Sequence, residues 1–239
     1  IDPNNPDAFY EHGMTHKSMG NLNQAVTSYN RSLEINPDND AALIALVSIY
    51  IDLGKYDNAL TESHKLVALK PEDPKNHLLL SITYRKFGDI HKSLLSAIKT
   101  VELNPDDPDS HLNLGSIYRD LGKLDQALES TLNSITLKED NSDAHSNLGR
   151  IYVDLGNLNA ALESTLKSIE LRKHNPTAYL NLGIIHDQLG HFEESIQAFN
   201  KAKQSESIAE TASIKLAQLY SSRKQYKHAL ESINDLDNK

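Results

Sequence analysis

The chain has 239 residues, of which 38% are hydrophobic and 24% are charged, and its formal net charge is −9. No stretch approaches roughly 18 consecutive apolar residues, which excludes a membrane-spanning helix. The excess of acidic residues argues against nucleic acid or an anionic membrane as a partner. Cysteine is absent, so disulfides, thiolate zinc sites and a cysteine nucleophile are excluded. We expect a cytoplasmic protein, although a chain that starts with Ile does not reveal its compartment.

Glycine and proline recur along the chain with one period. Gly20, Gly54, Gly88, Gly122, Gly156 and Gly190 are each separated by 34 residues. Pro3, Pro37, Pro71 and Pro105 follow the same spacing. A fixed period of this length predicts a single array of repeated units over residues 1–239. We set the repeats at 6–39, 40–73, 74–107, 108–141, 142–175, 176–209 and 210–239, with residues 1–5 as the tail of a preceding repeat.

Each repeat has the pattern of two helices joined by a tight turn. In the fourth, the apolar residues Leu114, Ile117, Tyr118 and Leu121 fall at i, i+3, i+4 and i+7, and Gly122 then ends the helix. A second helix is expected to start at a residue that can cap it, which corresponds to Asn23, Asp57, Asp125 and Asn159 in four of the repeats. The twentieth place of every repeat is Ala or Ser, which lets the two helices approach closely.

These residues resemble the tetratricopeptide repeat family over the whole chain. The family motif Leu-Gly-x-x-Tyr, then Ala, stands here as Leu114, Gly115, Tyr118 and Ala127. Departures occur where Val47 and Ser81 replace the motif glycine, and the segment 203–210 is polar where earlier repeats carry Ile or Leu. The resemblance implies an all-α fold, a right-handed superhelical solenoid of about seven helix-turn-helix repeats whose first helices line a concave groove.

One place on the expected groove carries asparagine in three successive repeats: Asn113, Asn147 and Asn181. A carboxamide can both donate to and accept from a peptide backbone. The series is similar to the asparagine ladder of the O-linked N-acetylglucosamine transferases, which implies that it holds an extended peptide. The alternative is that the three residues were inherited by duplication of the repeats.

Arginines accompany the ladder on the same expected surface, as Arg85, Arg119 and Arg150. Guanidinium groups in an otherwise acidic protein favour an acidic or carboxylate-bearing peptide as the ligand. The alternative is ordinary solvated charge, paired internally, with Asp154 as the partner of Arg119 or Arg150.

Histidines at positions 77, 111 and 145 also keep the 34-residue spacing and invite a comparison with zinc sites. We interpret them as packing residues, because they stand where the family places an aromatic side chain and no carboxylate recurs beside them. No catalytic constellation, phosphate-binding loop or cofactor motif is recognisable. We therefore expect neither a metal nor a cofactor.

The sequence thus predicts a non-catalytic scaffold that binds a protein or peptide in an extended conformation. Two alternatives remain open. In one, the array is fused to a transferase-type enzyme and presents substrates to it. In the other, it self-assembles into a homo-oligomer through its ends, because Leu230, Ile233 and Leu236 form an apolar stripe in the last repeat.

Overall fold

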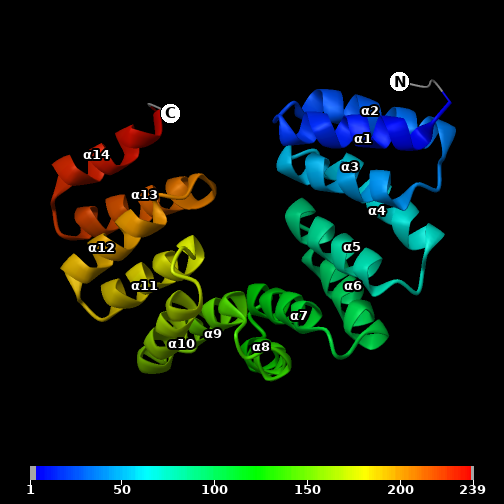
Figure 1. The fold of residues 1–239 in the computed structure, drawn as a ribbon. Coiled ribbons are helices and arrows are strands. Elements are labelled where there is room, and N and C mark those ends of the chain that lie inside the picture. The colour runs from blue at the N-terminus through cyan, green and yellow to red at the C-terminus, as the bar shows by residue number, and fades with distance from the viewer. Residues whose placement is uncertain (1–3, 238–239) are drawn as a thin grey trace. The chain divides into compact units, whose positions relative to one another are not determined.

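The computed structural model describes residues 4–237, with side chains up to residue 233, so Ile1, Asp2 and Pro3 lie outside the described part. Residues 4–237 form fourteen α-helices arranged in pairs and contain no β-strand (Figure 1). The first helices of the pairs are α1 (Pro6–Ser18), α3 (Asp40–Asp52), α5 (Pro74–Phe87), α7 (Pro108–Asp120), α9 (Ser142–Asp154), α11 (Pro176–Gln188) and α13 (Glu206–Ser222). The second helices are α2 (Leu22–Ile35), α4 (Tyr56–Leu69), α6 (Ile90–Leu103), α8 (Leu124–Leu137), α10 (Leu158–Leu171), α12 (Phe192–Ala202) and α14 (Tyr226–Asp237). The all-α helical repeat array predicted from the sequence is confirmed.

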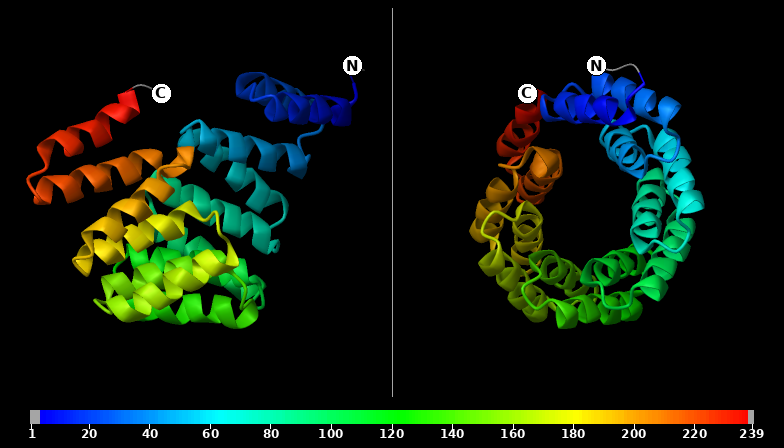
Figure 2. Two further views of the ribbon diagram at one scale, coloured as in Figure 1. Left: turned by 60° about the vertical axis from the view of Figure 1, so that its left-hand side comes forward. Right: turned by 45° about the vertical axis from the view of Figure 1, so that its right-hand side comes forward.

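The chain divides into two compact units, of which the first ends at Asn113 and the second begins at Leu114, inside α7. In each unit a second helix packs between its own first helix and the first helix of the next repeat, as α4 does between α3 and α5, and α10 between α9 and α11. First helices also touch one another, at α3–α5, α9–α11 and α11–α13. Each unit therefore has a layer of first helices backed by a layer of second helices, and the views in Figure 2 show the same pairing.

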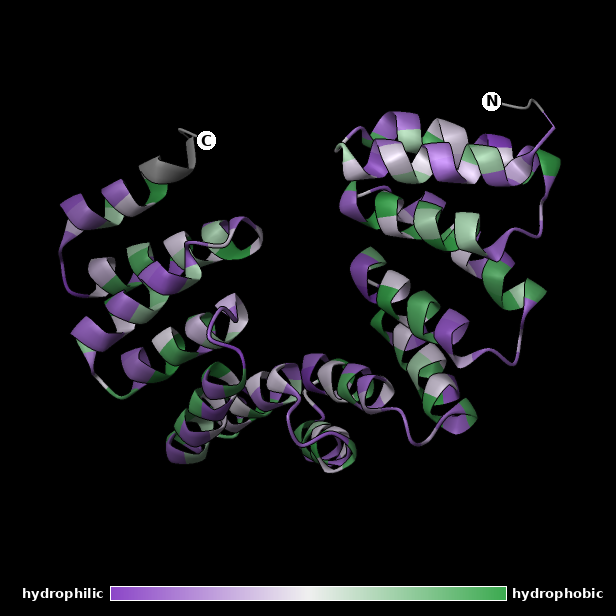
Figure 3. Cartoon of the chain, in the orientation of Figure 1, coloured by the Kyte–Doolittle hydropathy of each residue, from purple (hydrophilic) through white to green (hydrophobic). Residues whose placement is uncertain are grey.

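The small residues at the twentieth place lie where the paired helices are closest. Their six representatives in the first six repeats are all 0% exposed: Ala25, Ala59, Ser93, Ala127, Ala161 and Ser195. Large side chains such as Tyr29, Leu46 and Phe199 fill the space around them. Hydrophobic and hydrophilic residues alternate along the helices (Figure 3), and helices such as α2 and α12 carry them on different sides, as expected for helices that bury one stripe. None of the described helices is long and apolar enough to cross a membrane.

The turn inside each repeat requires a left-handed backbone. All six glycines of the 34-residue series have φ between +68° and +97°, a region that residues with a Cβ seldom adopt. In the last repeat Lys224 stands at the same place with φ 60°. The expectation about the caps of the second helices is wrong by two residues. The N-cap residues of α2, α6 and α10 are Asn21, Asp89 and Asn157. In α4 and α8, Asp57 and Asp125 lie in the first helical turn and not at the N-cap.

The sixth repeat departs from the others at its end. The second helices of the first five repeats have 14 residues each, whereas α12 has 11 and ends at Ala202. The polar residues that follow form a turn, and α13 then begins at Glu206, four residues before the predicted start of the seventh repeat. Lys203 and Ser205 stand where repeat five has Ile169 and Leu171, so this turn of α12 has no apolar stripe to bury, and its loss follows from that replacement.

Candidate functional site

Two of the predicted asparagines lie in the second unit, and each bonds to side chains of the repeat before its own. Asn147 donates from Nδ2 to Thr131 Oγ1 at 2.9 Å, and its Oδ1 accepts from Arg119 Nη1 at 3.5 Å. Asn181 donates from Nδ2 to the backbone oxygen and the Oγ of Ser146 at 3.0 and 3.1 Å. Its Oδ1 accepts from Arg150 Nη1 at 3.4 Å. In both cases the amide joins the preceding repeat and holds an arginine of that repeat.

Asn113 belongs to the first unit and follows the same rule with its amide nitrogen. Its Nδ2 donates to Ser81 Oγ at 2.9 Å. Ser81 is fully buried, and its hydroxyl in turn donates to the backbone oxygen of Ser93. Asn113 and Asn147 are half-buried, whereas Asn181 is only 2% exposed. The equivalence of the three amides expected from the sequence therefore does not hold. Asn181 in particular does not present its amide to a ligand, because both of its polar ends are used inside the array.

The two arginines held by these amides form a small charged cluster on α7 and α9. Besides its bond to Asn147, Arg119 donates from Nη2 to Asp120 Oδ1 at 3.1 Å, and its Nε lies 3.8 Å from Asp154 Oδ2. Burial, and secondarily the positive charge of Arg119, lowers the pKa of Arg150, while Asp154 and Asp120 act in the opposite direction. An arginine retains its charge under such perturbation. The cluster therefore concentrates two positive charges beside two carboxylates.

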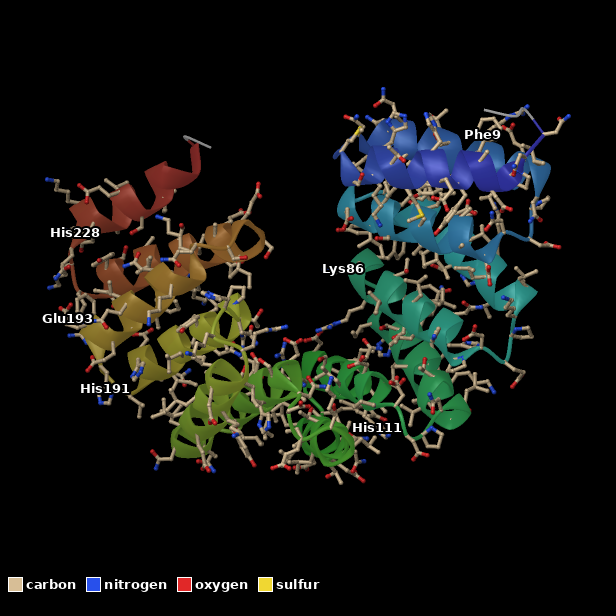
Figure 4. All side chains as sticks on the ribbon, in the orientation of Figure 1. Phe9, Lys86, His111, His191, Glu193 and His228 are labelled. Carbon is tan, nitrogen blue, oxygen red and sulfur yellow. The ribbon has the colours of Figure 1, made fainter. Side chains whose placement is uncertain are left out.

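Arg85 lies in the last turn of α5, in the first unit, and is half-buried. Its neighbour Lys86, labelled in Figure 4, is exposed at the same end of the helix. The structure thus brings Arg119, Arg150, Asn147 and Asn181 together in the second unit and places Arg85 and Asn113 in the first. We call the surface at Arg119, Arg150, Asn147 and Asn181 the first-helix face of the second unit.

Open cavities lie on the other side of the same helices, where the sequence did not suggest a site. One has a volume of about 840 Å³ and is lined by His145, Leu148 and Tyr152 of α9 and by residues of α10. Because successive residues of an α-helix turn by about 100°, these three point away from Arg150 and Asp154 on the same helix. The equivalent cavity of the sixth repeat, which Glu194 lines with Tyr179 and Lys201, has only about 140 Å³. A further cavity, of about 730 Å³, lies beside it at the start of α11.

The histidines with 34-residue spacing fasten the loops between repeats. The Nε2–H groups of His77, His111 and His145 donate to the backbone oxygens of the residues six positions earlier, at 2.7, 2.8 and 3.0 Å. His111 is seen at the start of α7 in Figure 4. Among the side chains of residues 4–233, no three His, Asp or Glu groups gather in a way that could hold a metal ion.

Known repeat families account for most of the chain. A model described as "TPR repeat" matches residues 115–156 and 149–190, and models described as "Tetratricopeptide repeat" match residues 16–83, 97–129 and 176–207. No protein with curated annotation matches the chain in sequence.

Solved structures show the same arrangement of helices. A thermophilic TPR protein from Thermus thermophilus is 26% identical, with a TM-score of 0.61, over 72% of this chain and 94% of that one. A tetratricopeptide repeat protein from Parabacteroides merdae is 19% identical, with a TM-score of 0.82, over 92% of this chain and 85% of that one. YrrB, described as a TPR protein with an unusual peptide-binding site, is 21% identical, with a TM-score of 0.56, over 74% and 91%.

The 34-residue period, the paired helices with small residues at their contacts, and the matching models along the array lead to one conclusion. The chain belongs to the tetratricopeptide repeat family.

Proposed function

We propose that the chain is a non-catalytic protein-interaction scaffold that binds an extended peptide segment on the first-helix face of the second unit. Arg119 and Arg150 contact acidic side chains of that peptide, and Asn147 and Asn181 are positioning residues that hold the two arginines. The observation that carries this proposal is the pair of arginine–asparagine hydrogen bonds, which hold two neighbouring guanidinium groups at fixed places. The description of YrrB as a protein with a peptide-binding site is consistent with it.

Arg150 is the better placed of the two arginines to receive a ligand. A guanidinium group has five N–H donors in a planar fork. Among the described residues, Arg150 makes one side-chain hydrogen bond, to Asn181, so most of its donors are available to a carboxylate. Arg119 already interacts with Asp120 and Asp154. A ligand carboxylate must therefore compete with these two residues for hydrogen bonds at Arg119, whereas at Arg150 the same two carboxylates act only through their charge.

The spacing of the first helices suits an extended ligand. Packed helices lie about 8–10 Å apart, and an extended peptide advances about 3.3 Å per residue. Arg119 on α7 and Arg150 on α9 would then meet side chains about three residues apart on the peptide. In the first unit we propose that Arg85 contacts an acidic side chain of the peptide in the same way. Asn113, at the end of that unit, bonds to Ser81 of the preceding repeat. Each hydrogen bond to a charged group contributes about 1.5–3 kcal/mol, so a few such contacts give modest affinity.

A displayed dodecapeptide library tests the proposal directly. Selection on the wild-type chain should enrich peptides with Asp or Glu residues at a spacing of about three. Binding of these peptides should weaken at least about tenfold in an Arg119→Gln/Arg150→Gln double variant. Arg172→Gln serves as the matched control, because Arg172 is an exposed arginine paired with Asp143 elsewhere in the same unit. Selected peptides that bind the double variant and the wild type equally well would overturn the proposal, provided that both chains have the same helical content.

Self-assembly through the last helix is a second candidate, and one observation favours it. Tyr226, Leu230 and Ile233 of α14 share one side of the helix and are 62%, 63% and 44% exposed. Leu236, which continues this stripe in the sequence, lies outside the described side chains. We propose that a second copy of the chain covers the stripe. Sedimentation equilibrium should then show a dimer that Leu230→Lys dissociates, whereas a wild-type monomer at high concentration would rule this out.

A further inference from the structure

The cavity at the start of α11 differs from the others in the charge of its lining. It has a volume of about 730 Å³ and is lined by Lys173, Tyr179, Lys201 and Gln204, together with His174, Pro176 and Ser205. Tyr179 and Asn181 are two residues apart on α11 and therefore point about 200° apart. The cavity thus lies on the opposite side of this helix from the first-helix face of the second unit.

The cavity lies beside the point where α12 stops early. In repeat five, α10 continues to Leu171, but in repeat six α12 ends at Ala202, three places earlier in the repeat. The helical turn that would wall the cavity is replaced by the segment 203–205. Gln204 and Ser205 from this segment line the mouth, and Tyr179 and Pro176 form an apolar floor. The segment that follows the shortened helix therefore contributes polar residues to the lining of the cavity.

One residue exchange within the repeat frame leaves Lys201 of this cavity without the carboxylate that its equivalents in the first and fifth repeats have. In the first repeat Arg31 pairs with Glu34 at 2.6 Å, and in the fifth Lys167 pairs with Glu170 at 3.2 Å. The corresponding residues in the sixth repeat are Lys201 and Gln204.

Glutamine cannot neutralise the lysine. Lys201 lies over the ring of Tyr179, with Nζ 5.0 Å from the ring centre, as Arg31 lies over Phe9 in the first repeat. None of the described carboxylates pairs with Lys201 or with Lys173 across the cavity. The lining of this cavity contains no Asp or Glu, in a chain whose net charge is −9.

We propose that this cavity binds an acidic side chain of an extended polypeptide partner. The carboxylate would lie between the ammonium groups of Lys173 and Lys201, and the aliphatic part of the side chain would pack on Tyr179 and Pro176. Two unneutralised cations beside an aromatic face attract a carboxylate more strongly than the mixed charges of the neighbouring cavity, where Glu163 and Glu170 accompany Lys167. This site does not depend on the proposed function, because it uses the other side of α11.

An NMR titration of the isotope-labelled chain with an N-acetylated hexaglutamate amide tests the proposal at low salt. The resonances of Tyr179 and of residues 173 and 201 should shift and saturate, and a hexaglutamine peptide should leave them unchanged. Lys201→Ala should weaken binding about fivefold, and Gln204→Glu should weaken it similarly by restoring the carboxylate found in other repeats. Lys167→Ala, the equivalent lysine of repeat five, should leave binding at this cavity unaltered.

Three results would overturn the proposal. The first is an absence of shifts at Tyr179 when hexaglutamate is added. The second is equal binding of hexaglutamate by the wild type and by Gln204→Glu. The third is that inorganic phosphate at equal ionic strength saturates the same resonances more readily than the peptide, which would mark a site for small anions. Melting curves and circular dichroism of each variant establish that the fold is retained, since all the substituted side chains lie on the surface.

Discussion

Asn147 donates from its amide nitrogen to Oγ1 of Thr131 across 2.9 Å, and this hydrogen bond joins α9 to the second helix of the preceding repeat. Thr165 stands one repeat later, at the place that Thr131 occupies, but its Oγ1 is buried without a hydrogen-bond partner among the described residues. The corresponding amide, that of Asn181, is directed to Ser146 instead. Of these two equivalent threonines, Thr131 therefore has a hydrogen-bond partner for its hydroxyl and Thr165 has none among the described residues.

This difference predicts opposite effects for one substitution at the two threonines. Thr131→Val should lower the free energy of unfolding by about 1–2 kcal/mol, because it leaves the amide of Asn147 without its acceptor. Thr165→Val should be neutral or stabilising, since it removes a buried hydroxyl that has no partner among the described residues. Urea denaturation of both variants measures the two changes in the free energy of unfolding. Because both variants replace threonine by valine, each is the control for the change in side-chain shape in the other. An equal loss of stability in both variants would contradict the hydrogen-bond assignment.

The direction of the asparagine amides could not be predicted from the sequence for a physical reason. Whether an amide at this place faces a ligand or the array depends on the presence of an acceptor in the preceding repeat. Ser81, Thr131 and Ser146 supply those acceptors, and they stand at three different places of their repeats. The period reveals the helices and turns, because these repeat. It does not reveal contacts that differ from one repeat to the next.

Helix packing inside the first six repeats follows a size rule that the sequence does contain. Where the motif glycine is present, the facing place of the second helix carries Tyr29, Thr131, Thr165 or Phe199, which approach within 2.7 Å of a Cβ built on the glycine. Where Val47 and Ser81 replace the glycine, the residues at that facing place are the smaller Ser63 and Ala97. The departures from the family motif are thus compensated within the same repeat.

The size rule predicts that Gly149→Ala destabilises the array even though alanine favours helix. Its Cβ would lie 2.3 Å from Thr165 Oγ1 and 3.2 Å from the backbone oxygen of Ala161. We expect a loss of about 1–3 kcal/mol from overpacking. The double variant Gly149→Ala/Thr165→Ala should recover much of this loss, because it removes the closest contact. Thermal unfolding of the two single variants and the double variant forms a cycle, and additive effects would show that the two positions do not interact.

The turn of the last repeat offers a stabilising substitution. Lys224 adopts φ 60° at the place where the other six repeats have glycine. Left-handed backbone costs a residue with a Cβ about 1–2 kcal/mol relative to glycine. Lys224→Gly should therefore stabilise the α13–α14 hairpin by about 1 kcal/mol, after allowance for the greater flexibility of unfolded glycine. Hydrogen exchange of amides in α14 is the suitable measurement, because repeat arrays unfold locally. Gly190→Ala, at the equivalent turn, is the control and should accelerate exchange in α12.

The ion pair between Asp40 and Lys70 predicts a defined dependence of stability on pH. The Lys70 ammonium, through its hydrogen bond and charge, lowers the pKa of Asp40, and Asp40 in turn raises the pKa of Lys70. A carboxyl whose pKa is lower in the folded chain stabilises the fold above its unfolded pKa of about 3.9, and that contribution is lost as the pH falls through its folded value. The lysine contributes below its unfolded pKa of about 10.4 and loses its contribution as the pH rises further.

Between these limits the pair is intact, so Asp40→Asn should lower the melting temperature slightly near neutral pH. The difference between variant and wild type should shrink as the pH is lowered from about 6 to about 3, because the wild-type carboxylate then becomes protonated. Both side chains are substantially exposed, at 40% and 51%, so added salt should also reduce the difference. Melting curves across this pH range measure the effect, with Asp38→Asn as an exposed control nearby. A difference that grows toward low pH would contradict the assignment of the lowered pKa to Asp40.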